Sequence, residues 1–192
     1  MSVDYDMARA TLAERIGEGA LRHSERVADT CADLARIYGL DVAEARLAGL
    51  LHDWDRETPD DELVATAATE GVVRDAVDDA APRLLHARTA AASLAREVPG
   101  LSPEVLSAIE RHTLGAPDMS ALDMVVYVAD MIEPGRTYKG VDDLREAAGT
   151  LSLDELFAEA YRRSVMHLVT ARKPIHPLTV EVWNTLVARS RS

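Results

Sequence analysis

Apolar residues recur at intervals of three and four along most of this 192-residue chain. That spacing limits the possible folds more than any other feature, because it puts the apolar side chains on one face of a helix. One such face is formed by residues four, three and four positions apart, namely Val27, Cys31, Leu34 and Tyr38. Glycines suited to helix caps or turns separate the segments at positions 39, 71, 100, 115 and 149. The pattern predicts an all-α fold.

Helix start signals support this prediction. Three pairs place a capping oxygen three residues before a carboxylate, namely Asp41 with Glu44, Ser120 with Asp123 and Ser152 with Glu155. Thr58-Pro59 and Ser102-Pro103 place a proline where a first helical residue is expected. The apolar run at 124–129 is rich in β-branched residues and also suits a buried strand. Because that run follows the Ser120 signal, we expect a buried helix there.

The length and composition favour one domain over residues 1–192, with a core of about 15–150 and a helical extension of about 151–192. The longest apolar run is far shorter than a membrane span. No signal peptide is visible at the N-terminus, and the single cysteine, Cys31, suits a reducing cytoplasm. We therefore expect a cytoplasmic protein.

The chain is acidic, with 33 Asp+Glu against 21 Lys+Arg and a formal net charge of -12. This balance argues against nucleic acid or an anionic membrane as a partner, because phosphate groups repel an acidic surface. A phosphate-bearing ligand is therefore expected to be small and bound by local positive charges. Residues 53–79 are especially rich in acids, which indicates a solvated helix face.

Six titratable residues lie where apolar helix faces continue or end, namely His23, His52, Asp53, His86, His112 and Asp130. A single histidine on such a face is more often a hydrogen-bonded core residue than a ligand. Several imidazoles buried with two carboxylates are costly, however, and a bound metal removes that cost. The neighbours His52 and Asp53 reach one site only from a helix end, because adjacent residues on a helix point about 100° apart. We interpret the set as a metal centre.

A short loop after Asp130 carries two cations between glycines. Arg136 and Lys139 lie in the segment Gly135–Gly140, six and nine residues after Asp130. Cations in a loop beside a metal ligand suit a polyphosphate, although such a loop is also compatible with a purely solvated surface. Trp54 and Tyr138 are candidates for stacking on a base or for a structural role.

The order His, His-Asp, Asp resembles the signature of the HD-domain metal-dependent phosphohydrolases. Several segments resemble more narrowly the YqeK-type symmetrical bis(5′-nucleosyl)-tetraphosphatases, over residues of about 15–185. These segments are residues 48–53, 111–115, 119–120, 127–136 and 138–141. The resemblance implies an HD-domain helical bundle with extra C-terminal helices.

The resemblance also implies roles for individual residues. The metal ligands would be His23, His52, Asp53 and Asp130, and the metal would be iron first, with manganese, cobalt, nickel or magnesium as alternatives. Asp53, His86 and His112 would be catalytic, and the two histidines would face the phosphates or hold a second metal. The substrate contacts would be Arg22, Asp53, Trp54, Asp55, Arg56, His86, His112, Asp130, Arg136, Thr137, Tyr138, Lys139, Gly140, Val141 and His176.

The reaction so implied is symmetrical hydrolysis of diadenosine tetraphosphate to two ADP, with a homodimer as a possible assembly. Three alternatives stay open, namely an HD phosphohydrolase of another nucleotide (a deoxynucleotide or a guanosine polyphosphate), a catalytically silent nucleotide-sensing module, and a plain helical interaction protein. Two positions depart from the family pattern. Arg56 stands where lysine is common, and Trp183 stands where an arginine is expected, so Arg172 or Lys173 would have to replace that arginine.

Overall fold

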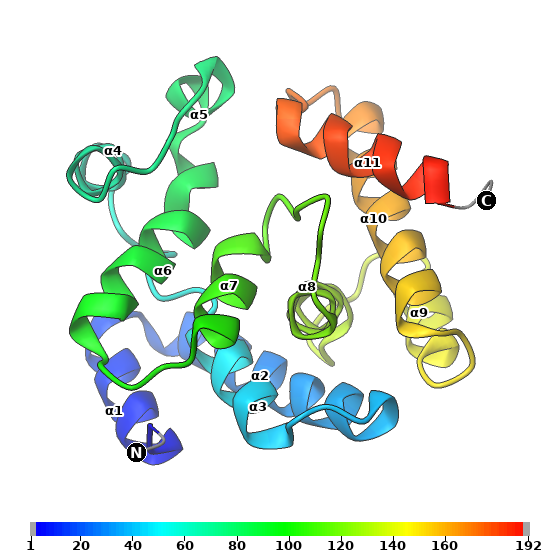
Figure 1. Cartoon of the computed structure of the whole chain (residues 1–192), viewed down its shortest axis with the longest axis horizontal. Helices are drawn as coiled ribbons and strands as arrows, with labels where there is room; N and C mark the ends of the chain where they lie inside the picture. Colours follow the sequence, from blue (N-terminus) through cyan, green and yellow to red (C-terminus); the bar gives the residue numbers. More distant parts are fainter. Residues whose placement is uncertain (1–2, 190–192) are drawn as a thin grey trace.

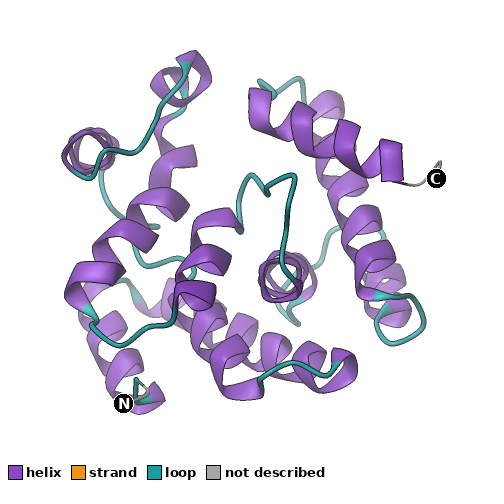
Figure 2. Cartoon of the chain, in the orientation of Figure 1, coloured by secondary structure: helices purple, strands orange, loops and turns teal. Residues whose placement is uncertain are grey.

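The computed structural model describes residues 3–189. Within this range the chain forms α-helices and one short 3-10 helix, and no β-strand (Figure 2). The 3-10 helix is Pro82–Leu85. The α-helices are α1 (Tyr5–Arg15), α2 (Glu18–Tyr38), α3 (Val42–Leu51), α4 (Asp60–Thr69), α5 (Ala76–Ala80), α6 (His86–Glu97), α7 (Pro103–Arg111), α8 (Ala121–Ile132), α9 (Val141–Ala147), α10 (Leu153–Thr170) and α11 (Pro177–Arg189). The all-α prediction is confirmed.

Most of the predicted helix starts are confirmed. The Asp41 side chain caps α3, while Ser120 and Ser152 form capping boxes at the starts of α8 and α10. Helix α7 begins at Pro103 as expected. The prediction for Pro59 is wrong by one residue, because Pro59 is extended and precedes α4 as its cap. The three carboxylates in the first turn of α4 lie where the helix dipole favours negative charge.

Helix α8 occupies the centre of the molecule and is seen end-on in Figure 1. It contacts α2, α3, α7 and α10, which lie around it. The run at 124–129 is buried within this helix, so the prediction of a buried helix is confirmed. A helix that is apolar on all sides belongs in the interior. This central helix carries two acidic side chains inward, the fully buried Asp123 near its start and the partly buried Asp130 near its end.

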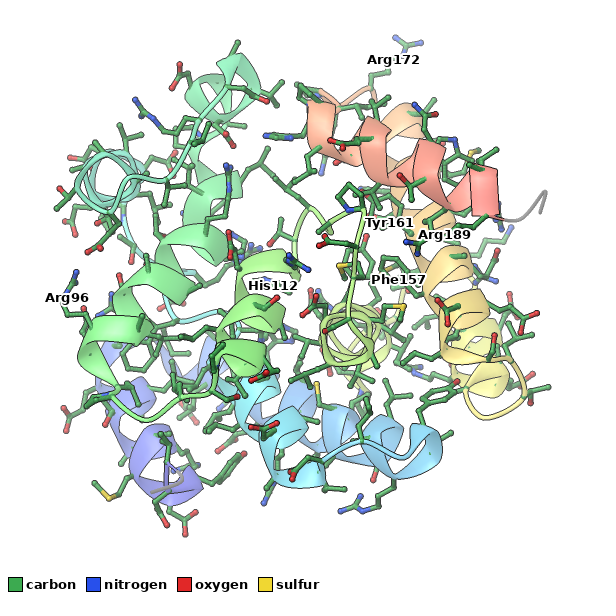
Figure 3. The ribbon with its side chains drawn as sticks, viewed as in Figure 1. Arg96, His112, Phe157, Tyr161, Arg172 and Arg189 are labelled. Atoms are coloured by element: carbon green, nitrogen blue, oxygen red, sulfur yellow. The ribbon has the colours of Figure 1, made fainter. Side chains whose placement is uncertain are left out.

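Helices α9, α10 and α11 pack on the side of α8 away from α1 (Figure 1). The contact between α8 and α10 is aromatic, and Figure 3 shows Phe157 and Tyr161 pointing from α10 toward α8. The ring of Tyr127 on α8 lies 5.2 Å from that of Phe157 and 5.4 Å from that of Tyr161, measured between centroids. Aromatic pairs at this spacing add to the energy of burial. The C-terminal helices are thereby attached to the central helix.

The prediction of a solvated face for residues 53–79 is wrong for part of the segment. Asp53, Asp55 and Asp78 are buried. Asp55 forms an ion pair of 2.6 Å with Arg15, and Asp78 pairs with Arg88. Both arginines lie outside the acidic segment, so a charge count limited to residues 53–79 could not predict these ion pairs. The other acids of the segment lie at least partly exposed.

Candidate active site

Four predicted ligands come from three helices that pack closely together. His23 projects from the second turn of α2, His52 and Asp53 directly follow α3, and Asp130 lies near the end of α8. Helices α2 and α3 approach closely at Gly49, where an added Cβ would lie 2.9 Å from the Cα of Ala28. A larger residue would separate the two helices. Glycine at this position therefore helps to bring His52 and Asp53 beside His23.

The donor atoms of these four residues converge. His23 Nε2 lies 3.0 Å from Asp130 Oδ1 and 3.8 Å from Asp53 Oδ2. His52 Nε2 lies 3.4 Å from Asp53 Oδ2 and 3.8 Å from Asp130 Oδ1. Two imidazole nitrogens and two carboxylates thus surround one point, as the metal prediction requires.

The chemistry of these donors fits a metal ion. The Nδ1 of His52 lies 2.8 Å from the carbonyl oxygen of Gly49 and donates a hydrogen bond to it. In the neutral ring the buried Nε2 is then an acceptor, and it has no hydrogen-bond partner. A lone pair directed at carboxylate oxygens is unfavourable unless a cation lies between them. Imidazole and carboxylate together suit a divalent transition metal.

The ionisation of these groups favours a positive charge at the centre. Burial alone would raise the pKa of the Asp53 and Asp130 carboxyls. The adjacent imidazoles of His52 and His23 outweigh burial, so the pKa of each carboxyl lies well below its usual range. Burial would lower the pKa of His52, but the charge of Asp53 raises it to about 9, so a metal ion that binds Nε2 must displace a proton from the ring. The carboxylates therefore stay ionised and attract a cation.

A second histidine pair lies against the other oxygen of Asp53. His86 Nε2 is 3.1 Å and His112 Nε2 is 3.5 Å from Asp53 Oδ1. Their Nδ1 atoms donate hydrogen bonds to the carbonyls of Arg83 and Ile109, three residues earlier in each case. Both Nε2 atoms therefore face inward, and Figure 3 places His112 in the middle of the molecule at the end of α7. Burial lowers the pKa of His112.

These groups open onto a cavity of about 680 Å³. Of the predicted residues, its lining contains His23, Asp53, Arg56, His86, His112, Asp130 and Arg136. The guanidinium of Arg136 pairs with the Asp130 carboxylate, and its Nε donates to the Asp130 carbonyl at 2.8 Å. The cations Arg56 and Arg136 therefore stand beside the ligand cluster, as a phosphate site requires.

The predicted loop after Arg136 is only partly near this centre. Tyr138 and Lys139 are exposed, and the buried Val141 begins α9. Gly140 adopts a φ of 89°, which favours glycine. Its carbonyl accepts a hydrogen bond from Arg163. Thr137 and Lys139 do not line the cavity, so their predicted substrate contacts stay predictions.

Three other predicted contacts lie outside the cavity lining. Arg22 is exposed and pairs with Glu18 on the same helix. Trp54 belongs to the hydrophobic core, with the guanidinium of Arg15 stacked 5.0 Å from its ring centroid. Asp55 is buried against the same arginine. These positions favour structural roles, and for Trp54 they favour the structural alternative over base stacking.

His176 lies in a separate cluster at the start of α11. Its Nε2 is 3.1 Å from Asp75 Oδ2 and 3.4 Å from Asp78 Oδ2. Its Nδ1 accepts the backbone N–H of Leu178 at 3.1 Å. The neutral ring therefore carries its proton on Nε2 and donates to the carboxylates, which favours a hydrogen-bonded cluster over a metal site. Arg172, one of the two residues expected to replace the missing arginine at position 183, lies at the outer edge of the molecule and points outward (Figure 3). Val182, next to position 183, is buried in the core.

Some residues of the site were missed by the sequence predictions. The cavity is also lined by Ala20, Glu57, Arg83, Thr113, Tyr127, Met131 and Ser164. Thr113 follows His112, and its hydroxyl lies 3.1 Å from His112 Nε2, so its position in the sequence was an available signal. Arg83 precedes His86 by three residues, whereas Ser164 lies on α10 and enters only through tertiary packing.

Comparison with known proteins gives consistent matches. The family model for the HD domain matches residues 20–135. The symmetrical bis(5′-nucleosyl)-tetraphosphatase of Bacillus subtilis (strain 168) is 32% identical over 188 residues, which cover 98% of this chain and 100% of the relative. The enzyme of the same name from Staphylococcus aureus (strain NCTC 8325 / PS 47) is 32% identical and covers 95% of this chain and 94% of the relative.

A solved structure is similar over nearly the whole chain. It comes from Clostridium acetobutylicum and is described as a predicted HD superfamily hydrolase involved in NAD metabolism. The two chains share 36% sequence identity with a TM-score of 0.90, and the match covers 98% of this chain and 100% of the other. The arrangement of helices around α8 is therefore shared with a solved protein.

Proposed function

This chain belongs to the HD domain family and, within it, to the symmetrical bis(5′-nucleosyl)-tetraphosphatases, and on that premise we propose that it hydrolyses diadenosine tetraphosphate to two ADP. Water attacks one of the two central phosphorus atoms, the bridging P–O bond between them breaks, and the departing ADP takes up a proton. The observation that carries the proposal is the convergence of the donor atoms of His23, His52, Asp53 and Asp130 beside a cavity that also contains His86, His112 and arginines.

HD domains bind divalent metals, and this chain has a suitable group of donors in His23, His52 and Asp130, with Asp53 beside them. We propose iron as the physiological metal, because two imidazoles and two carboxylates match its preference for mixed nitrogen and oxygen donors. When bound, the metal supplies Lewis-acid chemistry that acidifies water and polarises a phosphoryl oxygen. Manganese, cobalt, nickel and magnesium remain alternatives for metal analysis to distinguish.

The protein's own side chains bind and orient the tetraphosphate. Arg56, Arg83 and Arg136 line the cavity and offset the charge of the phosphates. Two arginines are oriented by protein contacts, since Arg136 is held against Asp130 and Arg83 is hydrogen-bonded to the Arg56 carbonyl. Cations fixed in advance stabilise charge that develops in a transition state. A polar cavity of this size can surround a polyphosphate chain with these cations, whereas a flat surface would contact it on one side only.

His86 and His112 are placed to exchange a proton with the reacting phosphates. Their Nε2 atoms lie at the cavity and 3.1 Å apart, with the Thr113 hydroxyl 3.3 Å from His86 and 3.1 Å from His112. We assign them to hydrogen bonding of phosphate oxygens and to protonation of the departing diphosphate. Asp53 contacts this pair with one oxygen and His52 with the other, and so links the proton-transfer groups to the metal ligands.

Purified, metal-loaded protein incubated with a nucleotide panel tests the proposal. Diadenosine tetraphosphate should give ADP as the single product. Release of ATP plus AMP would contradict symmetrical cleavage. A preference for a deoxynucleotide or a guanosine polyphosphate would favour the first alternative. Nucleotide binding with no turnover, by protein that also holds no metal, would favour the sensing module.

Four further features stay proposals. We propose one domain over the whole chain, because the main hydrophobic core includes residues from Ala8 to Val182, beside a small second cluster of Leu63, Ala67 and Leu85. Because the net charge is -12, we propose small nucleotides and not nucleic acid as ligands. We propose the cytoplasm as the location, because a single cysteine suits a reducing compartment. We also propose a homodimer as the assembly, which light scattering can test. Among residues 3–189, every helix is too short or too polar to traverse a lipid bilayer.

A further inference from the structure

We propose that Glu133 is a positioning residue that sets the tautomer and orientation of His23 and thereby the metal affinity of the site. The inference rests on the proposed ligand set and assigns a role to a residue outside it. Glu133 directly follows α8, three residues after Asp130, and its side chain is buried. Its Oε1 lies 3.1 Å from Nδ1 of His23.

The contacts hold the His23 ring from both sides. Nδ1 faces Glu133, and Nε2 lies 3.0 Å from Asp130 Oδ1. An ionised carboxylate only accepts hydrogen bonds, so Nδ1 must carry the proton. The Nε2 lone pair of the neutral ring is then directed at the proposed metal position. A carboxylate on the far nitrogen also makes an imidazole a more basic ligand.

His23 needs this partner because of its place in a helix. Three other histidines of the site lie at helix ends, where Nδ1 reaches the carbonyl three residues earlier, namely His52, His86 and His112. His23 lies within α2, where backbone carbonyls are engaged in the helix. Its Nδ1–H therefore requires a partner from another element, and Glu133 supplies one.

Glu133 is itself fixed in place. Its Oε2 accepts hydrogen bonds of 2.5 Å from Arg26 Nε and 2.5 Å from the Gly135 backbone N–H. Arg26 lies one turn after His23 on α2, so the carboxylate connects the end of α8 to the helix that carries His23. A Cβ at Gly135 would lie 2.6 Å from the Arg26 guanidinium. Gly135 thus leaves room for the arginine that holds Glu133.

The test measures metal affinity directly. Full-length wild type, Glu133→Gln and Glu133→Ala are titrated with cobalt(II) against a chromophoric chelator, and the visible spectrum of the bound cobalt is recorded. Removal of a carboxylate that orients a metal-bound histidine typically weakens binding about 10- to 100-fold. We expect that loss for Glu133→Ala with an altered spectrum, and a smaller loss for Glu133→Gln, whose amide oxygen still accepts from Nδ1.

A matched control separates positioning from stability. Asp123 is another buried carboxylate of α8, and it accepts a hydrogen bond of 2.9 Å from Arg111. Asp123→Asn should reduce folding stability and leave cobalt affinity within about twofold of wild type. In a His23→Ala background, the Glu133→Ala change should have no further effect on affinity.

Cobalt affinity and spectrum unchanged in both Glu133 variants would overturn the inference, as would an equal loss in the presence and absence of His23. Because the readout needs no nucleotide, failure of the proposed substrate leaves this test valid. Should Glu133→Ala not fold, Glu133→Gln and the Arg26→Gln variant, which releases the carboxylate, provide the same comparison. An unchanged affinity in both of those variants would also contradict the role.

Discussion

The Nε2 atoms of His86 and His112 lie 3.1 Å apart, and both approach the same oxygen of Asp53. Each ring already donates its Nδ1–H to a backbone carbonyl. Two neutral rings held in this way would bring two lone pairs and a carboxylate oxygen together, so the contact requires a shared proton or another cation. The arrangement suits a pair that exchanges a proton with a bound phosphate.

The first prediction concerns this pair. His112→Gln and His86→Gln should each lower kcat about 10²- to 10⁴-fold, the usual contribution of a general acid or base. The bound metal, measured by elemental analysis, should stay at the wild-type level. His167→Gln is the control, because His167 is exposed on α10, and its kcat should not change. Loss of metal from either site variant would instead identify that histidine as a ligand.

The second prediction concerns metal removal. Asp53 and Asp130 keep their negative charges close together, so a chelator should destabilise the fold by withdrawing the cation between them. At a free metal concentration 100 times Kd, binding contributes about 2.7 kcal/mol, or roughly 5–10 °C in Tm for a chain of this length. Differential scanning calorimetry with and without the chelator measures this shift.

Two variants check the assignment. Asp130→Asn should abolish the response of Tm to chelator, whereas Asp33→Asn, which changes an exposed side chain of α2, should keep it. A wild-type Tm that does not depend on chelator would contradict a structural contribution from the metal. Adding the metal back should restore the original Tm.

The sequence was most informative where structure depends on local signals. Apolar spacing and capping residues act within one or two turns, so α8 was predicted despite its β-branched residues. The convergence of the proposed metal ligands was also predictable from the sequence, because His52 and Asp53 end an apolar helix and Asp130 continues an apolar face. An apolar face must turn inward, and it carries its polar neighbours to the same interior.

Other features depend on contacts between distant segments. Trp54 and Asp55 follow the ligands in sequence, yet the turn after α3 directs them to the core and to Arg15. Ser164 reaches the cavity because α10 packs against α8. Glu133 becomes a partner of His23 only when α2 and α8 meet. No spacing rule along one helix contains this information.

The third prediction tests the close approach of α2 and α3. Gly49→Ala would place a Cβ 2.7 Å from Cys31 Sγ and 2.9 Å from the Ala28 Cα, and a backbone atom cannot rotate away. We expect a loss of about 1–3 kcal/mol from overpacking and weaker metal binding, because His52 and Asp53 move relative to His23. Urea denaturation and cobalt titration measure the two effects.

Gly19→Ala is the matched control for that variant. Gly19 is an exposed residue of α2, and an added Cβ there meets no atom within 4 Å. Alanine should stabilise the helix by about 0.5–1 kcal/mol and leave metal affinity unchanged. Equal stability changes in the two variants would show that the helices do not need glycine at position 49.

The fourth prediction concerns the ion pair between the buried Asp78 and the partly buried Arg88. Asp78→Asn leaves the arginine without its charge partner, which should cost about 3 kcal/mol at pH 7, the low end for a buried pair. Asp79→Asn is the control, because Asp79 is exposed and its ion pair with Arg74, 3.6 Å long, lies at the surface. It should change stability by less than about 1 kcal/mol.

The effect of Asp78→Asn should depend on pH. Burial would raise the pKa of Asp78, but the hydrogen bond from Arg88 brings it below the usual value. A carboxyl with a lowered pKa in the folded state stabilises the protein above its unfolded pKa of about 3.9, and that contribution is lost as pH falls. The stability difference between wild type and Asp78→Asn should therefore shrink from pH 7 to pH 3.5 in urea denaturation. A difference that stays constant or grows on acidification would show that the Asp78 charge does not stabilise the fold.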